Sequence, residues 1–279
     1  MPEYLEPSEE FGGLPVFDFP ESPADPAEAA TIPAEIESVA WRIGGSGFEV
    51  EVPWPQHFER FCDHVDTTRV RAFVIGSWSD LADGEYDPPD EVIGAMVAVR
   101  HRFPALRSVF LGDIGPDLAE ISWIEQGPVT ELLDAFPHLT ELLVRGSEEL
   151  SFAPIRHERL EKPTIQSGGL PAEVVRGVAA ADLPALTHLD LWLGTPGYSG
   201  DAEIADLAPI LSGERLPSPK HLALRNSEIQ DEICAALAGA PVVGRLETLE
   251  PGVLLDVGPD YAGPHSDDGE IHRYISVSE

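Results

Sequence analysis

Basic side chains are scarce in this chain. Lys and Arg number 17 against 50 Asp and Glu, which gives a formal net charge of −33 at neutral pH. A charge of this sign repels nucleic-acid phosphates and anionic lipid headgroups at physiological salt. We therefore expect neither nucleic acid nor a membrane surface as a partner.

Cysteines and long apolar runs are scarce too. Cys62 and Cys234 are far apart, each in an apolar, helix-like context, so we expect two buried free thiols rather than a disulfide or a metal site. No stretch approaches the roughly 20 apolar residues that span a bilayer, and no basic segment followed by an apolar run opens the chain. These features predict a protein of the reducing cytoplasm.

The sequence motifs of common enzymes are missing. The chain has no HExxH motif, no phosphate-binding loop ending in Gly-Lys-Ser or Gly-Lys-Thr, no GxSxG nucleophile elbow and no CxxC pair. Gly44–Gly47 lies between two strand-like runs and is typical of a hairpin turn, and Asp267–Glu270 lacks the regular oxygen spacing of a calcium loop. We expect no enzymatic activity, no cofactor and no bound metal.

A short phrase recurs six times, with apolar residues at its first, fourth and sixth positions. The phrases start at residues 70, 106, 139, 160, 186 and 219, so the intervals between them are 36, 33, 21, 26 and 33 residues. Helix-like segments follow at about 88–103, 128–136, 171–181, 203–212 and 229–239. This alternation predicts an α/β solenoid with a parallel sheet on its concave side and helices on its convex side. The 21-residue interval leaves room only for a turn and a poorly formed helix.

The chain divides into three parts on this pattern. Residues 1–65 are expected to form an N-terminal segment and cap, with a β-hairpin from two runs at 39–43 and 48–52. The apolar patch at 11–19 should dock on the body, because it contains three phenylalanines. Residues 66–250 hold the irregular repeats, and 251–279 form an acidic tail in which 273–277 is a candidate closing strand.

The phrase resembles the LxxLxL core of leucine-rich repeat proteins of the ribonuclease-inhibitor-like type over about residues 66–250. That family usually places Asn three residues after the last apolar position, where this chain has Ile114, Ser147, Gly168, Gly194 and Ser227. The resemblance thus implies a solenoid whose ladder of loop hydrogen bonds is missing or replaced.

Several segments are more closely similar to an uncharacterised bacterial family of leucine-rich repeat proteins. They are Val65–Arg71, Phe110–Ile114, Ile121–Gln126, Leu191–Gly194, Leu224–Ile229 and the ending Arg273–Glu279. No activity is established for that family, and its genes tend to neighbour radical-SAM-type and ATP-grasp-type enzymes. The resemblance implies an architecture, and it suggests an accessory or substrate-delivering subunit for such a modifying enzyme as an alternative function.

Pleat geometry selects candidate binding residues. Side chains at positions three, five and seven of each phrase should face the concave surface. These rows hold three Lys or Arg, two His and only two acidic residues, a local reversal of the charge of the chain, and also the apolar Phe110 and Leu143. The residues expected to contact a partner are Arg145, Gln166, Trp192, Arg225, His188 and Asp190.

Two interpretations of these rows stay open. In the first, Arg and Trp form a groove for a protein or peptide, with acidic groups on the partner favoured. On that view, replacing Arg145, Trp192 and Arg225 by Ala leaves the fold intact. In the second, Arg145 and Arg225 merely neutralise Glu141 and Asp190 on a crowded sheet face.

A metal interpretation of the same rows is weaker. His188 and His221 occupy equivalent positions of consecutive phrases and could share a metal with Asp190, as in a metal-dependent hydrolase. Two or three ligands are a weak signal, so stacked histidines on the sheet face are favoured. We therefore expect a non-catalytic repeat protein that binds a protein or peptide; the sequence leaves its oligomeric state open.

Overall fold

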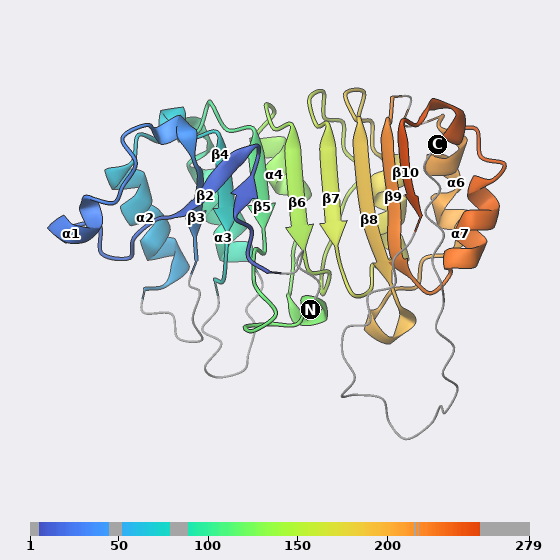
Figure 1. The fold of residues 1–279 in the computed structure, drawn as a ribbon, viewed down its shortest axis with the longest axis horizontal. Helices are drawn as coiled ribbons and strands as arrows, with labels where there is room; N and C mark the ends of the chain where they lie inside the picture. The colour runs from blue at the N-terminus through green and yellow to red at the C-terminus, as the bar shows by residue number, and fades with distance from the viewer. Residues whose placement is uncertain (1–5, 45–51, 79–88, 215, 217, 252–279) are drawn as a thin grey trace, which may run out of the picture.

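The computed structural model describes residues 6–44, 52–78, 89–214, 216 and 218–251. Their strands form one ten-stranded sheet in which strand order follows chain order (Figure 1). The strands are β1 (Glu10–Phe11), β2 (Leu14–Asp18), β3 (Ala40–Ile43), β4 (Ala72–Ile75), β5 (Ser108–Leu111), β6 (Glu141–Arg145), β7 (Lys162–Gln166), β8 (His188–Gly194), β9 (His221–Ser227) and β10 (Thr248–Pro251).

Helices follow most of the strands. The α-helices are α1 (Pro26–Ala29), α2 (Trp54–His64), α3 (Asp90–Ala98), α4 (Thr130–Ala135), α5 (Ala172–Ala180), α6 (Ile204–Ser212) and α7 (Gln230–Leu237). Short 3-10 turns are η2 (Ile36–Ser38), η3 (Thr67–Arg69), η5 (Arg100–Arg102), η6 (Ile121–Trp123), η7 (Pro196–Tyr198) and η8 (Val243–Arg245). Helices α2 to α7 share one hydrophobic core with one face of the sheet. We call the other sheet face the concave face.

The recurring phrase aligns residue by residue across the sheet. Ala72 pairs with Ser108, Ser108 with Glu141, and Glu141 with Lys162, so the third position of each phrase meets the third position of the next. The same register of phrase positions continues through β8 and β9, and every strand pairing from β2 onward is parallel. The α/β architecture predicted from the repeat is confirmed.

Three further strands extend the array beyond the six phrases. β2 and β3 precede them and β10 follows them, all in the same register. β3 is paired on both edges, with β2 and β4, so it is an inner strand of the sheet rather than the free arm of a hairpin. The second arm expected at 48–52 lies almost wholly outside the described residues, and so does the closing strand expected at 273–277.

The main core fills the space between sheet and helices with the apolar phrase positions. Leu186, Leu189 and Leu191 are all 0% exposed. Burying each side chain of this size contributes about 1.5–3 kcal/mol. In the first repeats the core is aromatic: Phe61 of α2 lies 5.4 Å from Trp41 and 5.4 Å from Phe73, centroid to centroid. Each repeat therefore buries its apolar side chains against those of its neighbours, as a solenoid requires.

The loops after the strands differ from the usual leucine-rich repeat ladder, as expected. Side chains still satisfy backbone carbonyls: Ser147, at the position where the family usually has Asn, donates to the carbonyl of Gly169 at 2.6 Å, and Asn226, one position earlier in its repeat, donates to that of Ser167 at 2.9 Å. Gly112 adopts φ +91°, and a Cβ there would lie 2.5 Å from the Arg145 carbonyl oxygen, so glycine is required. Residues 146–161 contain no helix, so the 21-residue interval is too short for the helix that the longer intervals hold.

Two smaller expectations have mixed outcomes. Both cysteines are free thiols, but only Cys62 is buried; Cys234, on α7, is exposed. Within the described ranges no helix has the length and apolar character needed to cross a membrane, and the longest, α2, has 11 residues.

Candidate functional site

The N-terminal segment covers the concave face of β3 to β5. The Phe11 ring lies 5.6 Å from the Phe110 ring, centroid to centroid, with an interplanar angle of 47°. β1 pairs antiparallel with β2 and stands first in the strand order. Phe11, Leu14 and Val16 close a second, small core whose other members are Ala40, Ala72, Val74, Phe110 and Leu143. We call residues 6–11 the strap.

A tight turn returns the chain from the strap to β2. Gly12 and Gly13 have φ of +61° and +71°, the left-handed values that a two-residue hairpin turn requires. A Cβ on Gly12 would lie 3.0 Å from the Ala72 Cβ and 2.9 Å from the Ser108 hydroxyl, whereas a Cβ on Gly13 would meet nothing within 4 Å. The turn therefore touches the sheet through Gly12 alone.

A buried carboxylate at the end of β5 organises the polar contacts of the strap. The Asp113 side chain is 0% exposed and accepts the main-chain N–H of Ser8, at 3.0 Å and 3.2 Å to its two oxygens. The Arg42 guanidinium donates to Asp113 at 2.9 Å and to the main-chain carbonyl of Ser8 at 3.1 Å. The Arg145 guanidinium is 3.6 Å from Asp113. Two cations thus offset one buried negative charge.

Arg42 and Arg145 reach this carboxylate from different strands. On β3, Arg42 also forms a two-point ion pair with Asp18 of β2, at 2.5 Å and 2.9 Å. Burial opposes the charge of Arg42, but Asp18 and Asp113 more than compensate and raise its pKa. On β6, Arg145 lies over the Phe110 ring at 5.1 Å, and burial lowers its pKa.

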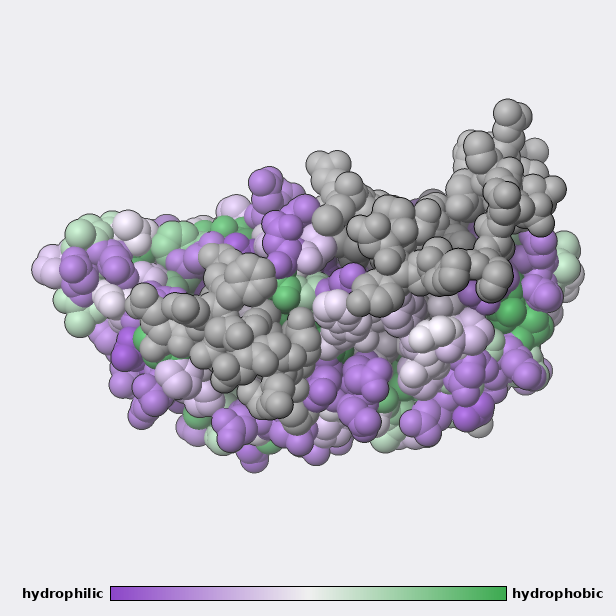
Figure 2. All heavy atoms as spheres, turned by 90° about the horizontal axis from the view of Figure 1, so that it is seen from below, coloured by the Kyte–Doolittle hydropathy of each residue, from purple (hydrophilic) through white to green (hydrophobic). Residues whose placement is uncertain are grey.

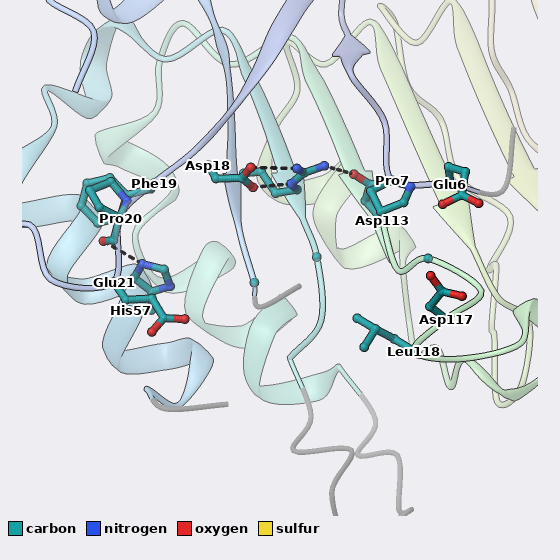
Figure 3. A pocket seen from close by; sticks show the side chains of 14 residues that line it. Glu6, Pro7, Asp18, Phe19, Pro20, Glu21, His57, Asp113, Asp117 and Leu118 are labelled. Carbon is teal, nitrogen blue, oxygen red and sulfur yellow. Dashed lines mark hydrogen bonds and ion pairs between the residues drawn. The ribbon is translucent and has the colours of Figure 1, made fainter. Parts of the chain in front are cut away.

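A cavity of about 410 Å³ adjoins this network at the carboxyl ends of β2 to β5 (Figure 3). Gly44 and Gly76 both line it at the seventh phrase position, and their main chains are so close that a Cβ on Gly44 would lie 2.6 Å from the Gly76 carbonyl carbon. The strap contributes Glu6 and Pro7 to the wall. The strap thus forms one part of the cavity wall.

Carboxylates dominate the wall of this cavity. Arg42 is the one Lys or Arg among its lining residues, whereas the acidic ones are Glu6, Asp18, Glu21, Asp113 and Asp117. His57 adds a ring nitrogen 3.1 Å from the Pro20 carbonyl, and burial lowers its pKa. Within the described residues, no group of three or more His, Cys, Asp or Glu side chains is placed to hold a metal ion.

The concave face is open further along the sheet, over β7 to β10. The third phrase position is exposed or half-buried on all four strands, and the fifth position is so on β7, β8 and β10, whereas Ala223 of β9 is buried. We call these exposed and half-buried side chains the open strip, together with the half-buried Arg225: Lys162, Thr164, His188, Asp190, His221, Arg225, Thr248 and Glu250. This surface is polar, unlike the sealed apolar face under the strap.

Arg225 links two acidic residues of the open strip. Its guanidinium is 2.8 Å from Asp190 of β8 and 3.0 Å from Glu250 of β10. Burial raises the pKa of Asp190 to about 6, although the charge of Arg225 and its hydrogen bond act in the opposite direction. The pairing of Arg225 with Asp190, expected in the second of our two interpretations, is confirmed. Arg145, expected beside Glu141, instead lies 3.6 Å from Asp113.

The two histidines of the open strip stack as expected. His188 and His221 are register partners, and their ring centroids are 5.4 Å apart with an interplanar angle of 27°. Burial lowers the pKa of His188, and the neighbouring His221 and Lys162 lower it further. The Thr187 hydroxyl lies 2.8 Å from Nδ1 of His188, and the Thr248 hydroxyl lies 2.5 Å from Nδ1 of His221.

Three of the six predicted contact residues are buried. Arg145 is 2% exposed, Trp192 3% and Gln166 9%. Gln166 accepts a hydrogen bond from Arg145 at 2.9 Å, and Trp192 packs against Ile121 in the loop after β5. These side chains point to the predicted face, but other segments cover them. Replacing Arg145 and Trp192 should therefore damage the fold, contrary to the sequence expectation.

The predicted basic and aromatic strip changes character accordingly. With Arg145 buried, the open strip has two cations, Lys162 and Arg225, and two carboxylates, Asp190 and Glu250. Phe110, expected as an exposed contact, is 0% exposed.

Figure 2, which views the edge where the strands end, shows mainly hydrophilic surface with small apolar patches. Trp123 and Tyr198 are the large apolar side chains most exposed in the described chain, at 48% and 36%.

The sequence reasoning missed the strap and its anchors. A signal was present for β2, because Leu14, Phe17 and Phe19 have the apolar spacing of the phrase. The phrase that forms β3 was not recognised, because its first position is the polar Ser38 and only Trp41 and Ile43 follow the apolar pattern. Asp113 gave no signal, because nothing local shows that a main-chain N–H from residue 8 meets it.

Comparison with known proteins found one similar solved structure, from a bacterium, and it supports the fold. No protein-family model matches this chain, and no curated protein sequence matches it. The chain is similar to the crystal structure of a Bacteroides fragilis protein solved as a Northeast Structural Genomics Consortium target, with a TM-score of 0.66 and 29% identity. The match covers 73% of this chain but 56% of that one, so this chain spans little more than half of its length. The likeness indicates homology and transfers no activity.

Proposed function

We propose that this chain is a non-catalytic repeat protein that binds another protein or a peptide through the open strip. The observation that supports this function is the register of the strip: exposed polar and charged side chains of four adjacent parallel strands stand in rows. Rows at the ~4.8 Å spacing of strands can contact successive positions of a partner segment laid across them.

The charges of the strip suggest how a partner would be selected. Arg225 is shared between Asp190 and Glu250, so this group of three keeps a net negative charge at the far end of the strip, while Lys162 carries a positive charge at the near end. A partner with an acidic group facing Lys162 and a basic group facing Glu250 fits this order. Such pairs set specificity and association rate more than affinity.

The test uses the full chain and two double variants of equal charge change. The strip variant is Lys162→Glu with His188→Glu, both exposed on the open strip. The matched control is Lys220→Glu with His138→Glu, both exposed but outside the strip. A partner is captured from the native host, identified by mass spectrometry and purified, and its dissociation constant is measured with all three proteins.

We expect the strip variant to bind at least about tenfold more weakly than the wild type, which corresponds to about 1.4 kcal/mol. The control should bind as the wild type does. Equal binding by the strip variant and the wild type would refute the proposed surface.

The same capture addresses the accessory-subunit alternative. That alternative is favoured by the resemblance to a bacterial repeat family whose genes neighbour radical-SAM-type and ATP-grasp-type enzymes. It expects the captured partner to be such an enzyme, in a complex that survives gel filtration. A partner of any other kind would remove this alternative and leave the binding function in place.

A further inference from the structure

We propose that the strap, residues 6–11, occupies a peptide-binding site on β3 to β6 and can leave it. The ligand that fits this site is an extended peptide with an aromatic side chain followed directly by glycine. This inference rests on the proposed peptide-binding function, and it adds a second site and the chemistry of its ligand.

Main-chain atoms of the strap make its polar contacts with the sheet. The Ser8 N–H donates to Asp113, and the carbonyls of Ser8 and Glu6 accept from Arg42 at 3.1 Å and from Arg145 at 3.5 Å. Every extended peptide offers the same main-chain groups, whatever its side chains. The Asp113 carboxylate and the two guanidinium groups therefore form a general receptor for peptide backbone.

Side-chain selection comes from one aromatic contact and one close approach. Phe11 is the only strap residue that is buried, and it packs on Phe110 beneath Arg145. The next residue, Gly12, passes so close to Ala72 and Ser108 that a side chain has no room. An aromatic residue followed by glycine is the pair that this surface accepts.

The strap is held less firmly than the strand that follows it. Its residues Glu6, Pro7, Glu9 and Glu10 are exposed. Beyond the Gly12-Gly13 turn, Phe17 and Phe19 belong to the main core and β2 is paired with β3. The turn can thus act as a hinge, at which the strap lifts from the sheet and gives up its short antiparallel pairing with β2, Glu10 with Pro15 and Phe11 with Leu14, while β2 stays paired with β3.

Hydrogen exchange on the full wild-type chain tests whether the strap leaves. We expect fragments covering residues 6–11 to exchange at least about 100-fold faster than fragments covering β5, because local release needs no unfolding of the sheet. Exchange of the strap as slow as that of β5 would overturn the proposal, because the strap would then be a fixed part of the fold.

Two matched glycine substitutions test whether the site accepts a ligand. Gly12→Leu and Gly13→Leu impose the same left-handed strain, but only the first places a side chain against the sheet. The probe is a fluorescent peptide with the sequence of residues 6–14. We expect Gly12→Leu to bind it at least about tenfold more tightly than the wild type, and Gly13→Leu to match the wild type.

The outcomes separate this inference from the proposed function. A peptide with Ala in place of Phe should not bind Gly12→Leu; if it binds equally well, the aromatic selection is refuted. Equal binding by Gly12→Leu and Gly13→Leu also refutes the site, and if Gly12→Leu does not fold, wild-type exchange alone decides. A strip variant that fails to weaken its partner refutes only the open strip, since the strap measurements involve none of its residues.

Discussion

Replacing Phe110 by Ala tests most directly whether the concave face under the strap is sealed. The ring is 0% exposed, packs on Phe11 at 5.6 Å and lies beneath the Arg145 guanidinium at 5.1 Å. An aromatic side chain at this phrase position would be solvent-exposed in an open repeat sheet. The structure instead predicts that it behaves as a core residue.

A sealed core and an open surface predict clearly different losses in the free energy of unfolding for Phe110→Ala. Phe→Ala in a packed core lowers the free energy of unfolding by about 3–5 kcal/mol, whereas a substitution on an open surface changes it by within about 0.5 kcal/mol. We expect a cost of about 3 kcal/mol, at the lower end, because the strap can relax into the space left by the ring. The Phe11 and Phe110 rings should also be coupled by about 0.5–1.5 kcal/mol.

Urea unfolding of four full-length proteins measures both quantities: the wild type, Phe110→Ala, Phe11→Ala and the double variant. Lys162→Ala, exposed on the same sheet face, serves as the control and should change the free energy of unfolding by less than about 0.5 kcal/mol. A cost below about 1 kcal/mol for Phe110→Ala, or no coupling with Phe11, would refute the sealed second core.

Three further predictions concern other parts of the molecule. Trp192→Ala should lower the free energy of unfolding by about 3–5 kcal/mol, because the side chain is 3% exposed; a loss below about 1 kcal/mol in urea unfolding would show that it is not packed. Because the pKa of Asp190 is raised to about 6 in the folded state, the folded chain binds more protons than the unfolded chain between pH 4 and 6, so this carboxyl lowers stability as the pH rises through that window. The stability of the wild type relative to Asp190→Asn should accordingly fall from pH 4 to 6, and a constant difference would contradict the raised pKa. A thiol reagent should modify Cys234 quickly and Cys62 only on unfolding, because Cys234 is exposed while burial raises the pKa of Cys62 to about 11; rapid reaction of the Cys234→Ser variant would contradict this placement.

The open strip and the strap divide one sheet face into two environments. Under the strap, the third and fifth phrase positions are small or apolar: Ala72, Val74 and Phe110. Over β7 to β10 the same positions carry Lys162, His188 and Glu250 among others. The change in residue type along one row therefore marks where the chain covers its own sheet and where it leaves the sheet accessible.

Local sequence was sufficient for the architecture of the repeats. Apolar residues at the first, fourth and sixth positions fix which side of a strand faces the helices, because side chains alternate across a pleated strand. The same spacing set the register, so the stacking of His188 on His221 was predicted correctly. Phe17 and Phe19 were likewise expected to dock, and they belong to the main core.

The environment of the concave face was decided only by tertiary structure. Pleat geometry placed Arg145, Trp192 and Phe110 on that face, but it does not say what lies above them. The answer came from contacts between distant segments, such as the Ser8 N–H and the Asp113 carboxylate, which are 105 residues apart in the sequence. Direction is a local property of a strand, whereas burial depends on every other segment that packs against it. The repeat therefore predicted the sheet, and the folded chain showed which half of its concave face carries exposed side chains.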